Sequence, residues 1–565
     1  MLGFPLRGRR HWQRYREIAQ ILVRHGFDQL IDLLELAPFV SLPARWFRQR
    51  HPSEDNTPQR LRHALEELGP TFVKLGQILS TRPDLIPPEY ILELSKLQDS
   101  AAPFPAADAR ALVERELDKP LDVLFASFDE APIAAASLGQ VHRATLRTGE
   151  RVVVKVQRPH IEQVVGTDLE ILFDLARLAQ TRTPLGNLYD LGEIAQDFAD
   201  TLRGELDYIR EGRNADRFRH NFAGDRAIYF PRVYWDYTTR RVLVLEELSG
   251  IKINDLAALD AAGINRHALA LESARLLVKQ VFEDHFFHAD PHPGNFYVLP
   301  PGAPGELTRI GAMDFGMVGW IDTRTREHLL RMMIAVVRQN VEGLVDEFLR
   351  MGVVDWGNLD RPRLERDLRS FLNRYRGLPL KDWRAREVMN DLIPISFRHH
   401  LRFPSELWLL GKTLTMSEGI GRMLDPDFDL FGVAEPYARQ LYMESITPKE
   451  VGKRALESLG DWGEEFLLLP HQLRSVVERL ERGALGVVVQ WEGQAQLAER
   501  LDRMVSRIAA SVLIAAFVLA VALLLPLLES DTWRVLAAVL IVLAFANATL
   551  VTLWLVFTTL PWRSR

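Results

Sequence analysis

The chain contains no cysteine among its 565 residues, which excludes disulfide bonds, zinc sites with thiolate ligands and catalysis by a thiol. It also lacks an excess of basic residues, because 69 Lys and Arg stand against 75 Asp and Glu, for a formal net charge of −6 at pH 7. We therefore expect no nucleic-acid partner. Two arginine-rich stretches, 7–16 and 361–376, are expected to be solvated helix faces or membrane-surface contacts.

The first 16 residues lack the features of targeting peptides. They are basic, but they contain neither the apolar run of a secretory signal nor the serines of an organellar transit peptide. This composition favours a bacterial protein that is not exported.

Two runs near the C-terminus, 508–528 and 535–560, contain no charged residue. Each meets the length of ~20 apolar residues that a helix needs to cross a bilayer, so they predict a transmembrane helical hairpin. Arginines precede the first run and follow the second, which predicts that both ends are cytoplasmic. The expected location is the bacterial cytoplasmic (inner) membrane, as a multi-pass protein with its main domain on the cytoplasmic side. The alternative is a buried apolar helical pair in a soluble domain.

Residues 288–295 read His-Ala-Asp-Pro-His-Pro-Gly-Asn, and Asp314 opens an Asp-Phe-Gly sequence further on. Kinase-type phosphoryl transfer uses one Asp to orient the nucleophile, an Asn five residues later to bind a metal, and the Asp of Asp-Phe-Gly to bind another. This order predicts that Asp290 positions the nucleophile and that Asn295 and Asp314 bind Mg²⁺, with ATP as the second cofactor. Lys155 ends an apolar run typical of a buried strand that aims an ammonium group at nucleotide phosphates.

The chain lacks the glycine-rich phosphate loop of kinases, and residues 134–141, Ala-Ala-Ala-Ser-Leu-Gly-Gln-Val, stand in its place. Each Cβ restricts φ and adds bulk over the nucleotide, so phosphates should be held differently from those in an ordinary protein kinase. An Ala-Pro-Glu activation segment is also absent after residue 316. Residues 245–250 end a predicted strand where a kinase hinge should bind adenine. The predicted nucleotide-binding residues are Ala134, Ala135, Ala136, Ser137, Gln140, Val141, Lys155, Glu246 and Leu248.

Taken in order, these motifs resemble the UbiB family of atypical kinase-like proteins, whose members support ubiquinone and related isoprenoid-lipid metabolism. The resemblance covers about residues 61–423 and includes two motifs peculiar to the family, residues 74–77 (Lys-Leu-Gly-Gln) and 205–207 (Glu-Leu-Asp). It implies that Glu211 is the partner of Lys155 and completes a catalytic set with Lys155 and Asp290. It also implies a family-specific set. Lys74 and Gln77 join the active site from outside the kinase fold, and Glu205 and Asp207 form a Glu-x-Asp motif that faces the Lys74 element.

The expected fold class is α+β, a two-lobed protein-kinase-like fold with extra N-terminal helices and the C-terminal hairpin. One continuous helix is expected over 191–222, with Asp207 and Glu211 on the same face. His288 is expected to fix the catalytic loop. The predicted domains are a helical leader (1–60), an extension with the Lys-x-Gly-Gln motif (61–120), a small lobe (121–246), a large lobe (247–430), a helical connector (431–507) and the transmembrane pair (508–560). The connector could dock on a membrane surface or pack against the large lobe.

The resemblance implies a membrane-anchored kinase-like ATPase that acts on or exposes intermediates of isoprenoid quinone biosynthesis, with ubiquinone as the first candidate. The implied partners are the membrane, a membrane lipid or prenylated quinone precursor, and quinone-biosynthesis enzymes. A lipid or small-molecule kinase is one alternative, and a nucleotide-binding scaffold without turnover is another. The complete Lys, Asp, Asn and Asp set disfavours the scaffold. An ATPase and a lipid kinase need the same machinery, so both stay open.

Overall fold

The computed structural model divides the chain into two compact units, Met1–Val451 and Gly452–Arg565. Nearly all of the structure described here belongs to the first unit. The described residues are 8–28, 31, 56–82, 85–97, 101–183, 186, 189–299, 308–354, 359–378, 382–434 and 542.

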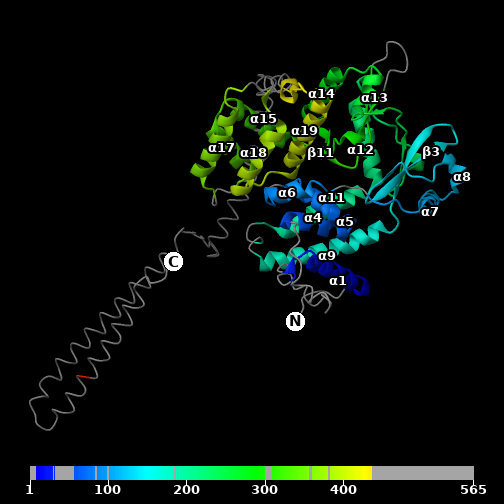
Figure 1. Cartoon of the computed structure of the whole chain (residues 1–565), viewed down its shortest axis with the longest axis horizontal. Coiled ribbons are helices and arrows are strands. Elements are labelled where there is room, and N and C mark those ends of the chain that lie inside the picture. Colours follow the sequence, from blue (N-terminus) through cyan, green and yellow to red (C-terminus); the bar gives the residue numbers. More distant parts are fainter. Residues whose placement is uncertain are drawn as a thin grey trace, which may run out of the picture. The chain divides into compact units, whose positions relative to one another are not determined.

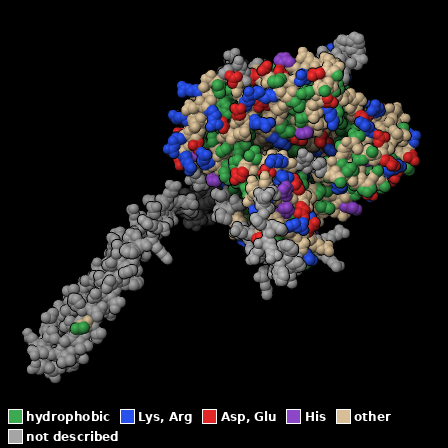
Figure 2. Space-filling view, in the orientation of Figure 1, with side chains coloured by type: hydrophobic (Ala, Val, Ile, Leu, Met, Phe, Trp, Pro, Cys, Tyr) green, Lys and Arg blue, Asp and Glu red, His purple; other side chains and the backbone are tan. Residues whose placement is uncertain are grey.

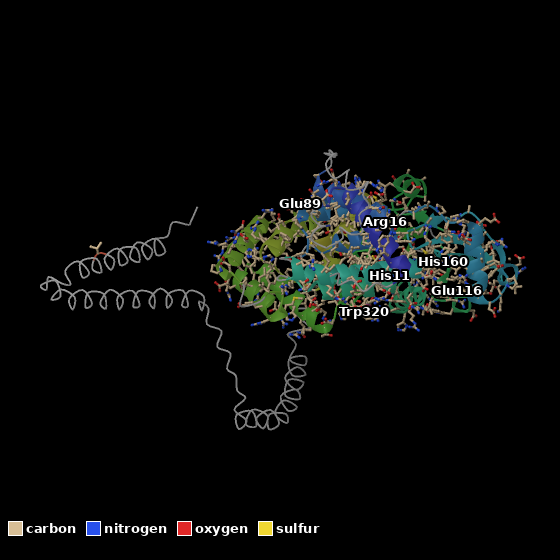
Figure 3. The ribbon with its side chains drawn as sticks, turned by 90° about the horizontal axis from the view of Figure 1, so that it is seen from below. His11, Arg16, Glu89, Glu116, His160 and Trp320 are labelled. Atoms are coloured by element: carbon tan, nitrogen blue, oxygen red, sulfur yellow. The ribbon has the colours of Figure 1, made fainter. Side chains whose placement is uncertain are left out.

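A group of N-terminal helices packs on the long helix α9 and on α11 (Figure 1). Asn56 begins α4 with a capping box in which its side chain and that of Gln59 each accept a backbone hydrogen bond. In α1, Arg14 donates to Asp168 of α9 at 2.7 Å, and Figure 3 shows this helix with His11 and Arg16 labelled. The helices are α1 (Gly8–Arg24), α4 (Thr57–Leu68), α5 (Pro70–Leu79), α6 (Pro88–Leu94), α9 (Ile161–Arg182) and α11 (Leu191–Glu205).

The small lobe is built on a five-stranded sheet in the order β1-β3-β4-β6, with β2 paired to β3. Successive side chains of a strand face opposite sides. In β4, Val152, Val154 and Val156 therefore join an outer cluster beneath α7, while Val153 and Lys155 face the lobe interface. The elements are α7 (Ala106–Leu117), α8 (Leu121–Leu124), β1 (Phe125–Phe128), β2 (Ala134–Ala135), β3 (Gly139–Leu146), β4 (Arg151–Gln157), α12 (Tyr208–Asn221), η3 (Trp235–Tyr237) and β6 (Val242–Glu246).

The large lobe combines a four-stranded sheet, β5-β10-β9-β7, a two-stranded sheet, β11-β8, and helices. A continuous apolar core joins α12 and β6 to α14 and α19. The elements are β5 (Ile228–Tyr229), β7 (Ile251–Lys252), α13 (Leu256–Ala261), α14 (Arg266–Phe282), β8 (Phe286–His288), η4 (Pro293–Asn295), β9 (Phe296–Leu299), β10 (Arg309–Ala312), β11 (Val318–Trp320), α15 (Thr323–Val337), α16 (Val341–Met351), α17 (Arg361–Tyr375), α18 (Ala385–Arg398) and α19 (Ser405–Leu424).

The surface of α17 shows what the second arginine-rich stretch does. Leu364, Leu368 and Phe371 of this helix are buried, whereas Arg363 and Arg366 are exposed. Figure 2 shows Lys and Arg side chains gathered over this region, with acidic side chains interspersed elsewhere on the visible face. The arginines therefore form the solvated face of an amphipathic helix.

The α+β class is confirmed, but the predicted membrane location is wrong for the structure as described. Within the described residues, no helix is both long enough and apolar enough to cross a membrane. The longest of these helices, α9 and α19, interrupt their apolar residues with charged ones such as Asp168, Asp174, Lys412 and Glu418. This finding corrects the prediction of a multi-pass protein of the bacterial inner membrane. Apart from Val542, the predicted spans lie outside the described residues, as does the predicted connector beyond residue 434.

The helix predicted over 191–222 is also corrected, because the structure breaks it into α11 and α12 at Leu206 and Asp207. The Asp207 carboxylate accepts hydrogen bonds from the amides of Ile209 and Arg210 and so caps the start of α12. Asp207 therefore does not share a helix face with Glu211. Glu205 ends α11, whereas Glu211 lies in the first turn of α12.

Candidate active site

An ion pair between Lys155 and Glu211 lies at the centre of the site. The Lys155 Nζ atom is 2.8 Å from Oε1 of Glu211 and 2.9 Å from Oε2, and 3.7 Å from Oδ1 of Asp314. Strand β4 supplies the lysine on its inward face, and the first turn of α12 supplies the glutamate. The structure thus brings together three residues that lie far apart in the sequence.

The Lys155 ammonium attracts both carboxylates, whereas burial and the charge of Asp314 raise the pKa of Glu211. Burial opposes the charge on Lys155, but Asp314 and Glu211 outweigh it and raise the pKa of Lys155 well above its ordinary value. The Lys155 ammonium lowers the pKa of Asp314 against the effect of burial, with smaller contributions from His288 and Lys74. At neutral pH, Lys155 is therefore positive and Asp314 is ionised, which are the states that phosphate and metal binding require.

Hydrogen bonds within the catalytic loop, residues 289–295, set its shape between β8 and β9. The Asp290 amide donates to Nδ1 of His288 at 3.3 Å, and Nδ2 of Asn295 donates to the Asp290 carbonyl at 3.2 Å. The Met313 amide donates to the Asn295 carbonyl at 2.8 Å, which ties the loop to the Asp-Phe-Gly segment. His292 accepts from the Gly294 amide at 3.1 Å and caps the short helix η4. Asp290, Asn295 and Asp314 are therefore held by one connected backbone network.

The Asp-Phe-Gly segment is anchored through its phenylalanine. Phe315 is fully buried, with ring centroids 5.8 Å from Phe218 and 6.1 Å from His288. Asn214 of α12 donates to the Phe315 carbonyl at 2.9 Å, and because Asn214 lies one turn beyond Glu211, this contact fixes the helix that reaches Lys155. Asp314 has a left-handed φ of 62°, a conformation that costs on the order of 1–3 kcal/mol and is typical of functional sites.

The donor set fits magnesium. Asp314 offers a carboxylate and Asn295 offers an amide oxygen, the hard oxygen ligands that Mg²⁺ prefers. No cluster of three or more His, Cys, Asp or Glu side chains suited to a metal occurs in the described parts of the chain. Mg²⁺ needs fewer protein ligands, because it keeps waters and takes further oxygens from nucleotide phosphates. Asp314 and Asn295 would hold the ion, which would supply positive charge to offset the negative charge of the phosphates.

The alanine-rich loop forms a tight hairpin in place of a flexible glycine loop. Ala134 and Ala135 form β2 and pair with Val141 and Gln140, and the Ala136 amide donates to the Gly139 carbonyl at 2.8 Å. From outside the loop, Arg158 donates to the Ser137 carbonyl at 3.2 Å and to the Ala136 carbonyl at 3.3 Å. Arg158 had no signal in the sequence, and its two hydrogen bonds tie the loop backbone to the residue after β4.

Two of the residues predicted to bind nucleotide direct their side chains elsewhere. The buried Gln140 side chain bonds both backbone groups of Phe104 and Nε2 of His142, on the face of β3 opposite to Val141. The Glu246 carboxylate accepts from the Tyr229 hydroxyl at 2.8 Å, and its amide donates to the Arg232 carbonyl. These side chains support the loop and the end of β6. The assignments of Ala134, Ala135, Ala136, Ser137, Gln140, Val141, Glu246 and Leu248 to nucleotide binding stay predictions.

The family-specific motifs meet only in part. Lys74 of α5 lies 2.7 Å from Oε2 of Glu205 at the end of α11, and each side chain is only 10% exposed. Gln77 donates instead to the Leu97 carbonyl at 3.2 Å, within the N-terminal extension. Asp207 caps α12 and lies 3.8 Å from Nε of Arg240. Lys74 therefore brings the extension to the site, and the assignments of Gln77 and Asp207 to the site stay predictions.

A further cation at the site was missed by sequence reasoning. Nζ of Lys412, in α19, lies 3.4 Å from Oδ1 of Asp290. The two residues are separated by 122 positions, and no motif surrounds the lysine. Only the packing of α19 against α14 and β11 brings them together.

The fold and the site define a protein-kinase-like arrangement with a closed Lys-Glu pair. Three family models match the chain: the ABC1 atypical kinase-like domain at residues 96–348, the UbiB helical domain at 368–429 and the ABC1/UbiB kinase-like C-terminal domain at 492–560. The chain is 35% identical over 500 residues to the probable protein kinase UbiB of Cellvibrio japonicus, across 87% of this chain and 89% of that protein. The chain belongs to the UbiB family of atypical kinase-like proteins.

Two other similarities were found. The chain is 40% identical over 451 residues to the uncharacterized protein sll1770 of Synechocystis sp., across 79% of this chain and 75% of that protein. The structure of the Rv3197 and erythromycin complex from Mycobacterium tuberculosis matches with a TM-score of 0.46 and 22% identity, across 66% of this chain and 93% of that chain. This second likeness is too low to carry an argument.

Proposed function

We propose that this chain is a kinase-like, magnesium-dependent ATPase that supports isoprenoid quinone biosynthesis, with ubiquinone as the first candidate. Its partner would be a prenylated quinone precursor, which ATP turnover makes available to the enzymes of the pathway. The observation that carries the ATPase proposal is the Lys155, Glu211 and Asp314 cluster, joined by backbone hydrogen bonds to the Asp290 loop. The pathway is inferred from the family.

In the proposed reaction, Asp290 orients a water molecule and accepts its proton. The water oxygen forms a bond to the terminal phosphorus of ATP while the bond from that phosphorus to the bridging oxygen breaks, and ADP leaves with the bond electrons. Lys155 contacts the remaining phosphates, and Glu211 holds Lys155 in position. General base catalysis of this kind contributes ~10²–10⁴ in rate.

The buried Lys74 and Glu205 pair disfavours a protein substrate. It fastens α5 to α11 beside the site, and the charge of Lys74 reaches Asp314 closely enough to lower its pKa. A peptide would have to displace this helix and break a pair that is shielded from water. Hydrolysis, or transfer to a small acceptor, makes no such demand.

A lipid or small-molecule kinase is the second candidate function. The exposure of the Asp290 side chain supports it. The Asp290 side chain is 37% exposed, so an acceptor hydroxyl could take the place of the water. The chemical difference between the two candidates lies only in the group that receives the phosphoryl.

Purified full-length chain, Mg-ATP and a short-chain prenylated phenol test the proposal. We expect phosphate release that the phenol accelerates, loss of nucleotide-dependent thermal stabilisation in Asp314→Asn, and turnover lower by about 10² or more in Asp290→Asn with ATP still bound. Transfer of label from the terminal phosphate to the phenol would establish the kinase instead. Unchanged nucleotide binding in Asp314→Asn would refute the site.

A deletion strain tests the pathway separately. We expect its quinone content to fall and to recover with the parent gene but not with the Asp314→Asn gene. Normal quinone content in the deletion strain would refute the biosynthetic role while leaving the ATP site intact.

A further inference from the structure

The catalytic loop has no permanently positive side chain for the transferred phosphoryl group. Residues 288–295 include neither Lys nor Arg. Phosphoryl transfer depends on fixed positive charges at the group in flight, because negative charge is spread over its oxygens. Lys155 is already paired with Glu211 and lies close to Asp314, the carboxylate expected to bind metal. A further cation must therefore come from another element.

Lys412 is placed where such a cation is needed. Its Nζ atom lies 3.4 Å from Oδ1 of Asp290, the carboxylate that orients the nucleophile. Because the nucleophile attacks the terminal phosphorus, a group beside Asp290 is next to the terminal phosphoryl and away from the adenine end. The Lys412 side chain is 33% exposed, so it is partly shielded from water and its interactions are less screened than those of a surface lysine.

The helix that carries Lys412 is anchored to the loop by the next residue. Thr413 is fully buried, and its hydroxyl is 3.4 Å from the Ala289 carbonyl and 2.9 Å from the Leu409 carbonyl. Adjacent residues of α19 thus face adjacent residues of the catalytic loop. The backbone of Lys412 is therefore fixed, while its long side chain can turn from Asp290 toward a phosphate.

We propose that Lys412 is a catalytic residue that contacts the terminal phosphoryl group of bound ATP and holds the Asp290 carboxylate in place. This inference rests on the proposed ATP site and assigns it a residue from outside the kinase motifs. ADP has no terminal phosphoryl group at this position. Lys412 therefore makes the site prefer ATP to ADP, in addition to any effect on turnover.

The test compares the affinities of Mg-ATP and Mg-ADP for the full-length chain and its Lys412→Met variant. Methionine keeps most of the length and apolar stem of lysine but removes the charge. We expect the variant to bind Mg-ATP about tenfold more weakly, as loss of one charge-assisted contact predicts, and to bind Mg-ADP within about twofold of the parent. Lys412→Arg keeps the charge and should retain the preference for ATP.

Lys279→Met is the matched control. Lys279 of α14 forms a partly buried pair with Asp284 at 2.7 Å, so this variant also loses a Lys-Asp contact in the large lobe. We expect it to lower the melting temperature and leave the ratio of ATP to ADP affinity unchanged. This control separates a general loss of stability from loss of a phosphate contact.

Equal weakening of ATP and ADP binding in Lys412→Met, or no change in either, would overturn the proposal. Slower turnover with an unchanged affinity ratio would also overturn it, because Lys412 would then act on Asp290 alone. The proposed ATP site itself would be refuted if the parent bound neither nucleotide, or if the Asp314→Asn variant still bound both nucleotides. The proposed role of Lys412 would then be refuted as well.

Discussion

Replacing Lys74 with methionine should destabilise the protein far more than replacing an ordinary surface lysine. Nζ of Lys74 lies 2.7 Å from Glu205, and each side chain is only 10% exposed. The variant leaves the Glu205 carboxylate without this partner in a shielded position, and breaking a buried pair in this way costs roughly 3–5 kcal/mol. Because some of each side chain still reaches water, we expect about 3 kcal/mol. For a unit as large as Met1–Val451, with an unfolding entropy of about 2.1 cal/mol/K per residue, this corresponds to a fall of roughly 3 °C in melting temperature.

Thermal unfolding of the purified chain measures the effect, with Lys96→Met as the matched control. Lys96 pairs with Glu93 in the same N-terminal extension, at 2.5 Å, but the lysine side chain is 58% exposed. The exposed Lys96 side chain contributes about 0–1 kcal/mol, so the control should melt within about 1 °C of the parent. Glu93 is itself only 12% exposed, but it keeps a second partner in Arg62 at 3.4 Å, so the control variant leaves no carboxylate unpaired.

The double variant Lys74→Met, Glu205→Leu tests the physical reason. Replacing both charges with apolar groups removes the stranded carboxylate, and such replacements are often neutral or stabilising. We expect the double variant to recover most of the stability that Lys74→Met loses. A single variant as stable as the parent, or a double variant whose loss is the sum of the two single losses, would refute the reasoning.

Three further predictions concern the small lobe and the extension. Burial lowers the pKa of His142, so the unfolded chain binds a proton that the folded chain does not, and the free energy of unfolding should fall as the pH drops below about 6.5. Melting temperatures from pH 8 to 5 should show a shallower slope in His142→Gln, and equal slopes would contradict this. Gly76→Ala should lower the free energy of unfolding in urea by about 1–3 kcal/mol, because the new Cβ would lie 2.3 Å from a Leu97 methyl carbon. Unchanged stability would show that the Leu97 side chain moves away without cost. Ala135→Gly should loosen the hairpin, shift the balance between ATP and ADP binding and permit autophosphorylation. Transfer of radiolabel from ATP to the protein would detect the autophosphorylation. Label transfer equal to that of the parent would contradict this prediction.

The parts of the structure that could be predicted have strong local signals. Strand β4, Arg151–Gln157, contains the apolar run that ends at Lys155, because a run of valines suits a strand buried on both faces. Motifs indicated Lys155 and Asp314, and the family resemblance implied Glu211 as the partner of Lys155. The structure brings the three together.

The parts that could not be predicted depend on contacts between distant segments, or on a residue that can either continue a helix or cap the next one. The break between α11 and α12, at Leu206 and Asp207, contains neither glycine nor proline. Asp207 sets it by capping the start of α12. The helical spacing of the apolar residues continues across the break, so the pattern predicted one helix. Arg158 and Lys412 act through contacts across 21 and 122 positions. An isolated arginine or lysine in a helical or loop pattern is ordinarily solvated, so neither had a signal that distinguished it.

The site draws its positive charge from three separately anchored elements. Lys155 comes from the small-lobe sheet, Lys74 from the N-terminal helix α5 and Lys412 from the C-terminal helix α19. Each is paired with a carboxylate at or beside the site, so the apo site already balances most of its charge. A bound nucleotide adds several negative charges, and the three lysines must then be shared between phosphates and carboxylates. The weakest of these pairs, by distance and exposure, is that of Lys412 and Asp290, and it is therefore the pair that the terminal phosphoryl group can most readily redirect.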